Sequence, residues 1–418
     1  MTDRSARHLL ALASLLCLVA AALGARPAAA AEPPSPPQLS ASAAILIDAR
    51  DGSVLYRSGS REERAIASTT KLMTALLSVE LLPLDKVVTA GTYHAGAAES
   101  QIHLRRGERM KVADLLRALL LESANDAAVT LARAAGGSVS GFVDLMNARA
   151  KQLGLSDTSY SNPVGLDEAG NHSSARDLAR LARRVLRNRF LAETVDMPRA
   201  RLTSGARERV VENRNDLVRR YPSIDGVKTG HTADAGYVLV GAARRKGVPL
   251  VSVVLGTPSE AARDTDTLRL LNYGAGLYRR QAVLRPGRPV ARSDVAYYGD
   301  RQADLTPARR LTLTVRRGER ARTVVAAPGE LDGPLDPGTA VGYVSVFYRG
   351  RKVARVPLVT AQAVPGAGLP RKIASWLWPP WLLAGAAVVA LVVRQRRTQR
   401  RAEEEAARRR RRRAARLD

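Results

Sequence analysis

The chain is built around one segment, Ala67-Ser68-Thr69-Thr70-Lys71-Leu72-Met73-Thr74-Ala75-Leu76-Leu77. Its apolar run from Leu72 to Leu77 predicts a mostly buried helix. Ser68 and Lys71 lie three residues apart and so share one face of that helix. Ser68 stands at the helix start, where free backbone N–H groups favour a developing anion. These are the parts of an activated nucleophile, although a serine cap followed by a solvated lysine is the alternative.

Residues 42–280 are predicted to form one α+β domain, in which helices pack on a mainly antiparallel sheet. Two short strands joined by the turn signal Asp51-Gly52 lead the chain towards Ser68. The other elements follow from apolar periodicity, β-branched runs and turn residues. Helices are expected at 112–121, 127–135, 141–153, 174–186 and 261–278, and strands at 44–48, 53–56, 226–232, 236–244 and 250–257.

A second polar segment, Glu122-Ser123-Ala124-Asn125-Asp126, interrupts two apolar helices. A tight link between buried helices would hold the Ser123 hydroxyl and the Asn125 amide in fixed positions. The alternative is that Asn125 or Asp126 only caps the helix that follows.

A third segment, Lys228-Thr229-Gly230, lies on a predicted strand. On a regular strand Lys228 and Gly230 point to one side and Thr229 to the other, unless a twist at the sheet edge turns the Thr229 hydroxyl into the site. Gly230 allows a ligand to come close to the backbone. A strand end with a solvated Lys228 is the alternative.

The three segments occur in the order S-x-x-K, S-x-N and K-T-G, and together they resemble the active-site serine β-lactamases and penicillin-binding proteins. The fuller stretches 67–76 and 225–232, and Asn162-Pro163 with Gly165-Leu166-Asp167, resemble the low-molecular-weight D-alanyl-D-alanine carboxypeptidases. The resemblance covers 42–280 and, more weakly, the β domain and the C-terminal anchor described below. The central triplet is S-A-N, and no Glu-x-x-Leu-Asn segment lies between Asn125 and Lys228, so a class A β-lactamase is disfavoured.

The resemblance implies a fold and a catalytic set. Ser68 would attack the carbonyl of the penultimate residue of a peptidoglycan stem peptide ending in D-Ala-D-Ala. Lys71, kept neutral, would take the serine proton, and Ser123 would relay a proton to the leaving D-alanine. β-Lactam antibiotics would acylate the same serine. The histidines form no metal motif, and no metal or cofactor is expected.

The resemblance also implies a binding set. Asn125 would bind the substrate amide, and Lys228 with Thr229 would hold the terminal carboxylate. In that family two backbone N–H groups form the oxyanion hole, here those of Ser68 and His231. Arg263 is a further candidate for support of the carboxylate pocket.

Three other functions are compatible with parts of this pattern. A D,D-endopeptidase would cut cross-links with the same residues, and a β-lactamase would turn over penicillin instead of remaining acylated. A non-catalytic wall-binding protein of this fold would be expected to have lost one of the three segments, and all three are present.

Both ends of the chain carry targeting features. Residues 1–31 have the basic start, apolar core and alanine-rich end of a secretory signal, and the only cysteine, Cys17, lies in that core. A proline-rich linker is expected at 32–41, a small all-β domain at 281–364, and a second linker at 365–375.

The C-terminal region is predicted to anchor the protein in a membrane. The apolar residues 376–393 are about as long as the hydrocarbon core is thick, with tryptophans at one end. Pro379-Pro380 shortens the regular helix, so a helix lying in the interface is the alternative. The basic tail, 394–418, would stay in the cytoplasm and leave the catalytic domain outside. Its arginine run suits anionic lipid headgroups, and no nucleic-acid partner is expected.

Overall fold

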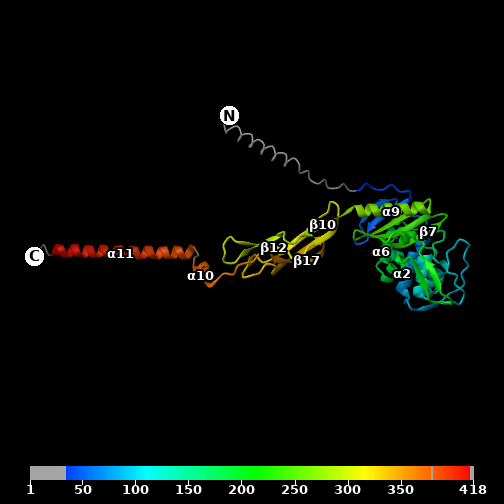
Figure 1. The fold of residues 1–418 in the computed structure, drawn as a ribbon, viewed down its shortest axis with the longest axis horizontal. Coiled ribbons are helices and arrows are strands. Elements are labelled where there is room, and N and C mark those ends of the chain that lie inside the picture. Colours follow the sequence, from blue (N-terminus) through cyan, green and yellow to red (C-terminus); the bar gives the residue numbers. More distant parts are fainter. Residues whose placement is uncertain (1–33, 378–379, 415–418) are drawn as a thin grey trace, which may run out of the picture. The chain divides into compact units, whose positions relative to one another are not determined.

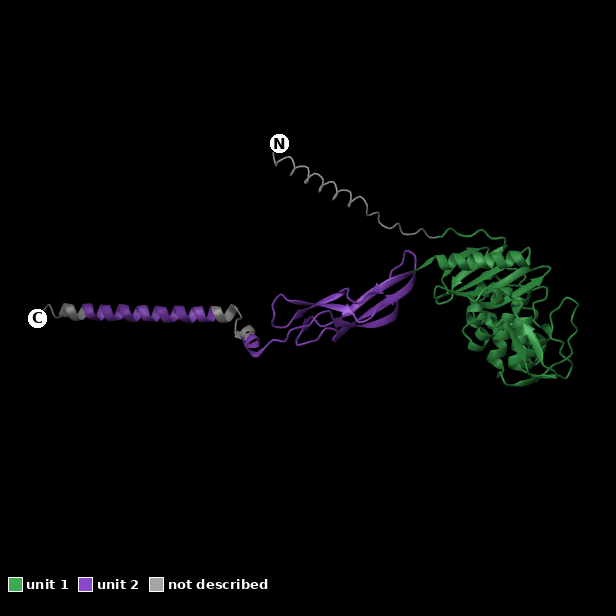
Figure 2. Ribbon diagram, in the orientation of Figure 1, with its two compact units in different colours: residues 1–279 green, residues 280–418 purple. Residues whose placement is uncertain are grey.

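The structure is a computed structural model that describes residues 34–377 and 380–414 (Figure 1). The chain divides into two compact units, and the boundary falls after Arg279 (Figure 2). The signal peptide predicted for 1–31 lies outside the described residues.

A five-stranded antiparallel sheet forms the centre of the first unit. Its strand order is β2-β1-β9-β8-β7, so β7 lies at one edge. The strands are β1 (Ala43–Asp48), β2 (Val54–Ser58), β7 (Ile224–Thr232), β8 (Gly236–Arg245) and β9 (Val248–Thr257). The predicted hairpin and three-stranded meander are confirmed, and so is the α+β class.

Helices and two small hairpins surround this sheet. The helical segments are η1 (Ala67–Thr70), α2 (Lys71–Leu81), α3 (Val112–Arg117), η2 (Ala118–Glu122), α4 (Asn125–Gly136), α5 (Val139–Gln152), α6 (Ala175–Val185), α7 (Arg189–Asp196), α8 (Asp216–Arg220) and α9 (Glu260–Gly276). The hairpins pair β3 (Val87–Thr89) with β4 (Arg109–Lys111), and β5 (Arg199–Leu202) with β6 (Arg209–Glu212). The sequence did not predict α7, α8 or either of the two hairpins.

The sheet separates two apolar layers. Helix α9 packs on one face, and α6 packs on the other with α2 behind it (Figure 1). Strand β1 serves both layers, because Leu46 packs with Leu270 of α9 while Ile45 and Ile47 belong to the larger cluster on the opposite side. All six residues of β1 are buried, as expected for a strand covered on both faces.

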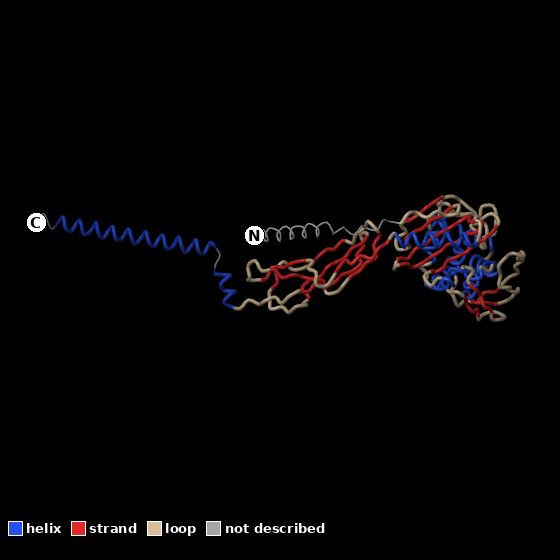
Figure 3. Tube along the Cα trace, turned by 45° about the horizontal axis from the view of Figure 1, so that its top comes forward, coloured by secondary structure: helices blue, strands red, loops and turns tan. Residues whose placement is uncertain are grey.

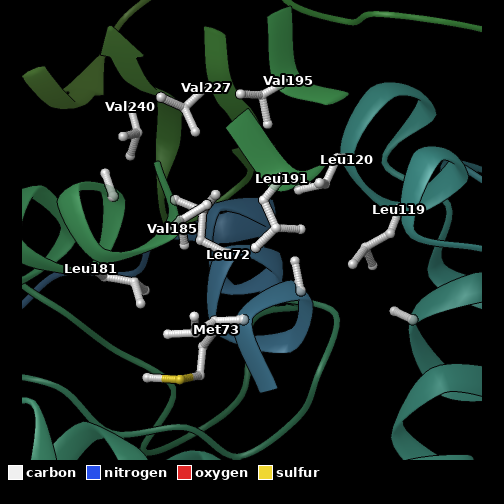
Figure 4. Packing of buried hydrophobic residues seen from close by; sticks show 14 of the residues in the cluster. Leu72, Met73, Leu119, Leu120, Leu181, Val185, Leu191, Val195, Val227 and Val240 are labelled. Atoms are coloured by element: carbon white, nitrogen blue, oxygen red, sulfur yellow. The ribbon is translucent and has the colours of Figure 1, made fainter. Parts of the chain in front are cut away.

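The larger cluster surrounds α2 (Figure 4). Leu72 and Met73, from the first turn of α2, lie among side chains of η2, α6, α7, β7 and β8, and all of them are at most 1% exposed. These side chains are Leu119, Leu120, Leu181, Val185, Leu191, Val195, Val227 and Val240. Interiors packed in this way are rigid, so the cluster fixes the helix start that carries Ser68 and Lys71.

The second unit contains a six-stranded sheet with the order β14-β16-β17-β12-β11-β15 and a separate pair, β10 with β13. No helix occurs in the described residues 281–364. The strands are β10 (Tyr278–Leu284), β11 (Ala291–Val295), β12 (Gln302–Pro307), β13 (Leu311–Arg316), β14 (Arg322–Ala326), β15 (Glu330–Leu331), β16 (Ala340–Tyr348) and β17 (Arg351–Thr360). The expectation that a β domain follows the first unit in the sequence is therefore confirmed.

Two helices follow the second sheet, α10 (Leu369–Leu377) and α11 (Pro380–Ala414), drawn as helix in Figure 3. Among the described residues, no helix combines the length and the apolar character needed to cross a membrane. The transmembrane span predicted at 376–393 is therefore not confirmed. The apolar part of α11 is bounded by the start of that helix at Pro380 and by the charged residues that begin at Arg394.

Candidate active site

Ser68 lies on the 3-10 turn η1, which continues directly into α2. Its side chain is half-buried, whereas Ala67, Thr69 and Thr70 around it are buried. Ala67 adopts a left-handed conformation with φ of 46°, which is uncommon for a residue with a side chain. The predicted position of Ser68 at a helix start is confirmed, with the refinement that the α-helix itself begins at Lys71.

Lys71 is the partner of Ser68. Its Nζ lies 2.8 Å from Ser68 Oγ and donates a hydrogen bond of 2.6 Å to the carbonyl oxygen of Val164. The side chain is fully buried. The Val164 contact uses one N–H of the amine and points the nitrogen towards the serine hydroxyl. The alternative of a solvated lysine is thereby excluded.

The surroundings of Lys71 favour its neutral form. Burial lowers the pKa of Lys71 well below its usual value, the positive charge of Lys228 lowers it further, and the carboxylate of Glu99 opposes both effects. A neutral amine has a free lone pair, so the lowered pKa favours the form of Lys71 that is able to accept a proton.

The loop 162–167 supports this pair from the side. Thr74 of α2 donates a hydrogen bond of 2.7 Å to the Pro163 carbonyl, and Gly165 N donates one of 2.7 Å to Asn162 Oδ1. Gly165 has φ of 87°, and a Cβ atom there would lie 2.0 Å from the carbonyl oxygen of Ala67. Only glycine therefore allows this loop to touch η1.

Ser123 and Asn125 lie where the sequence predicted a tight link. Ser123 directly follows the π-helical turn η2 as its C-terminal cap, has φ of 65° and is 7% exposed. Asn125 begins α4, and its Nδ2 donates a hydrogen bond of 2.6 Å to Glu99 Oε2. The capping alternative is wrong, because Ala124 is the N-cap of α4 and no side chain makes a cap hydrogen bond there. Asp126 instead accepts hydrogen bonds from its neighbour Ala127 N and from the segment 102–104.

Glu99 is a site residue that the sequence analysis missed. It accepts hydrogen bonds from the Tyr93 hydroxyl, from Asn125 Nδ2 and from Gly96 N. Burial raises the pKa of Glu99, but these hydrogen bonds and the charge of Lys71 outweigh burial and lower it overall. No local spacing in the sequence marks this residue, because its partner Asn125 lies 26 positions away.

Lys228 is buried in edge strand β7. It is 1% exposed, and its Nζ donates a hydrogen bond of 3.0 Å to the Thr229 carbonyl. Burial lowers its pKa to about 7, with contributions from the positive charges of Arg214 and Arg263. Arg263 is itself 3% exposed and paired with Asp264 and Glu260. It therefore acts on Lys228 through its charge.

Gly230 and His231 bring β7 against the nucleophile. A Cβ atom on Gly230 would lie 2.9 Å from Ser68 N and 2.8 Å from Val238 Cγ2, so the absence of a side chain lets the strand reach η1. The His231 side chain is exposed and stacks on Tyr237, with ring centroids 4.0 Å apart.

These residues surround a hollow of about 360 Å³. It is lined by Ser68, Ala98, Glu99, Ser100, Ser123, Asn125, Val164, Gly165, Leu166, His231, Thr232 and Ala233. The hollow thus collects Ser68 with Ser123 and Asn125 of the second segment and with His231, Thr232 and Ala233, which directly follow the third segment. Lys71, Lys228 and Thr229 do not line it, since their side chains are buried behind its wall.

A serine beside a buried lysine, on a helix that packs against an antiparallel sheet, defines an active-site serine enzyme of the acyl-transfer type. The D-alanyl-D-alanine carboxypeptidase family matches residues 29–259, and the C-terminal domain of penicillin-binding protein 5 matches 278–366. The chain belongs to the D-alanyl-D-alanine carboxypeptidase family, whose members are serine peptidases.

Individual relatives agree with this family. The D-alanyl-D-alanine carboxypeptidase DacF of Bacillus subtilis is 31% identical over 80% of this chain and 90% of its own length. DacD of Escherichia coli is 32% identical over 79% of this chain and 88% of its own length.

Solved structures are similar too. Penicillin-binding protein 5 of Haemophilus influenzae has a TM-score of 0.57 and 29% identity, and the match covers 80% of this chain and all of that one. The Streptomyces K15 DD-transpeptidase has a TM-score of 0.55 and 32% identity, covering 58% of this chain and 99% of its own.

Proposed function

We propose that the protein removes the terminal D-alanine from peptidoglycan stem peptides through an acyl-enzyme formed on Ser68. The observation that carries the proposal is the 2.8 Å contact between Ser68 Oγ and the amine of Lys71, which is buried and has a lowered pKa. A nucleophile next to a neutral base is what acyl transfer requires at neutral pH.

The first half of the reaction forms the acyl-enzyme. Ser68 Oγ attacks the carbonyl carbon of the penultimate D-alanine, and Lys71 Nζ takes the hydroxyl proton. The negative charge on the carbonyl oxygen is held by the backbone N–H groups of Ser68 and His231. The C–N bond then breaks, and the proton passes from Lys71 through Ser123 to the leaving D-alanine.

The second half releases the shortened peptide. Water attacks the ester carbonyl, Lys71 accepts a proton from it, and Ser68 leaves with a proton restored. A β-lactam enters the same first step, because its strained amide replaces the peptide bond. The ring nitrogen stays attached to the acyl group, which leaves the serine blocked.

Substrate binding falls to the residues around the nucleophile. Asn125 holds the substrate amide, and the ammonium group of Lys228 with Thr229 holds the terminal carboxylate, a charge-assisted contact. Gly230 supports this role indirectly, because its missing side chain lets β7 approach the turn that carries Ser68.

Release of D-alanine from a pentapeptide tests the proposal. The wild-type protein is expected to release D-alanine and to be labelled covalently by a penicillin, whereas Ser68→Ala does neither and keeps the thermal unfolding midpoint of the wild type. Full penicillin labelling of Ser68→Ala would show that another residue is the nucleophile.

We also infer that the protein is exported by residues 1–31 and held at a membrane by its C-terminal segment, with the β domain as a spacer. The apolar residues 376–393, followed by arginines from Arg394 onwards, support this location, either across the bilayer or in its interface. Cell fractionation of the full chain and of a chain ending at Pro365 tests it. Equal release of both forms into the soluble fraction would exclude the anchor.

A further inference from the structure

Glu99 occupies an unusual place in the active site. Among the described residues that line the hollow, it is the one carboxylate. Its two oxygens accept three hydrogen bonds, from Gly96 N at 2.8 Å, from Asn125 Nδ2 at 2.6 Å and from the Tyr93 hydroxyl. A carboxylate held by three donors is fixed in position and stays ionised.

The contact with Asn125 decides which way the Asn125 amide points. Its Nδ2 group faces Glu99, so the carbonyl oxygen of the amide is turned away from that carboxylate. In the flipped orientation, Asn125 Oδ1 would lie against a carboxylate oxygen, and two acceptors at that distance repel each other. A neutral amide in place of the Glu99 carboxylate would discriminate less between the two orientations of Asn125. Such an amide can rotate and donate a hydrogen bond to Asn125 Oδ1.

We propose that Glu99 is a positioning residue for the carboxypeptidase reaction: it locks the substrate-binding amide of Asn125 in one orientation and keeps a negative charge beside Lys71. This role rests on the proposed function of the site. Glu99 itself makes no bond to the reacting atoms, so it acts through Asn125 and through its charge. Tyr93 and Gly96 in turn hold Glu99 in place.

The charge of Glu99 affects the pKa of Lys71, an effect that a purely structural residue would lack. Lys71 interacts with two charged groups, Lys228 from β7 and Glu99 from the loop between β3 and β4, and they act in opposite directions on its pKa. His231 at the rim and Tyr93 beside Glu99 are the other titratable groups around the hollow. Removing the negative charge is therefore expected to extend the range of neutral Lys71 to lower pH.

Glu99→Gln in the full chain tests both parts. The second-order rate of acylation by a penicillin is expected to fall about 10- to 100-fold, the usual effect of losing a hydrogen bond to a charged group. The acidic limb of the pH–rate profile is expected to move to lower pH by about half a unit or more. In an Asn125→Ala background, Glu99→Gln should cause no further loss of rate but should still shift the acidic limb.

Three further variants keep the test decisive. Glu193→Gln makes the same change at an exposed glutamate paired with Arg189, and it should leave both rate and profile unchanged. Glu99→Asp retains the charge and should keep the wild-type profile even where the rate falls. Tyr93→Phe keeps the charge and should reduce the rate mildly.

The outcomes separate this proposal from the proposed function. A wild-type protein that is not acylated by penicillin would contradict the proposed function. An active wild type with an unchanged rate and pH profile in Glu99→Gln would overturn the positioning role. An equal fold-loss of rate with and without Asn125 would also overturn it, because Glu99 would then act by another route.

Discussion

Lys71 and Lys228 both carry buried amines. Among the described residues, these amines hydrogen-bond only to uncharged groups, namely a hydroxyl and carbonyl oxygens. Burying an amine without a carboxylate disfavours its charged form, and here each lysine also repels a positive neighbour. Such groups reduce the free energy of unfolding, so their presence marks a site selected for chemistry at the expense of stability.

Lys228→Met should therefore stabilise the protein while abolishing turnover. The pKa of Lys228 is about 7 in the folded state, below its usual 10.5, so the unfolded chain binds the extra proton between these values. The destabilisation by Lys228 is complete below pH 7 and disappears as the pH approaches 10.5. We expect a gain of several degrees in the unfolding midpoint at pH 7 and a smaller one at pH 10.

Thermal unfolding at both pH values, with D-alanine release measured in parallel, checks this prediction. A variant that is less stable than the wild type at pH 7 would contradict it. Methionine is chosen because it is unbranched and fills the same space without a charge.

Lys71→Met tests the base directly. Removing a positioned general base is expected to slow acylation by about 10²- to 10⁴-fold, with the fold retained. Lys86→Met is a matched control, since Lys86 is exposed and lies outside the site. The measurement is the rate of covalent labelling by a penicillin, followed by intact mass. Acylation within a few-fold of the wild-type rate would exclude Lys71 as the base.

At this scale the sequence predicted the segments that hold Ser68, Lys71, Ser123, Asn125 and Lys228, because each carries a short, fixed spacing. Glu99 could not be found in that way. Its importance depends on a contact made across the fold, and a single glutamate in a polar loop has no pattern of its own. The burial of Lys228 was equally invisible, because a lysine on an edge strand is expected to be solvated.

The contact between the loop 162–167 and η1 is the element on which the nucleophile depends. Gly165→Ala places a Cβ atom 2.0 Å from the Ala67 carbonyl and must displace η1. We expect penicillin acylation to fall at least about tenfold, because small displacements of a nucleophile are costly in rate. Gly154→Ala is the control, because Gly154 has φ of 69° but open space around it.

Both glycine variants carry similar backbone strain, so the comparison isolates the steric effect on η1. Thermal unfolding should show a larger loss for Gly165→Ala, which adds the steric clash to the strain, and only Gly165→Ala should lower the acylation rate. Equal acylation rates would mean that the loop does not set the position of Ser68.

Among the elements, those with regular apolar periodicity were predicted best. Helices α5, α6 and α9 and strands β7 to β9 lie within a few residues of their expected bounds. The π turn η2 was predicted as ordinary helix, since the apolar run 118–121 is compatible with either form. The β5–β6 hairpin was missed because its strands, Arg199–Leu202 and Arg209–Glu212, are mostly polar and only partly buried.

For the molecule as a whole, the division after Arg279 leaves both apolar clusters of the first sheet within one unit. We therefore expect residues 34–279 alone to fold cooperatively and to be acylated by penicillin within about twofold of the full chain. The Streptomyces K15 structure supports this expectation, because 58% of this chain matches 99% of that structure. A shortened chain that is folded but not acylated would contradict it.

The two architectures could be predicted because the sequence changes from helical periodicity to alternating β-branched strands near residue 280. The transmembrane span at 376–393 stays a prediction from apolar length, because no helix among the described residues has the length and apolar character of a span.

The buried Lys228 also links substrate binding to the uptake of a proton from the buffer. With a pKa of about 7, roughly half of the free protein carries this proton at neutral pH. On its proposed role, a substrate carboxylate would raise that pKa and draw a proton from the buffer as it binds. The heat of binding should then vary with the ionisation enthalpy of the buffer, because the peptide and a proton bind together.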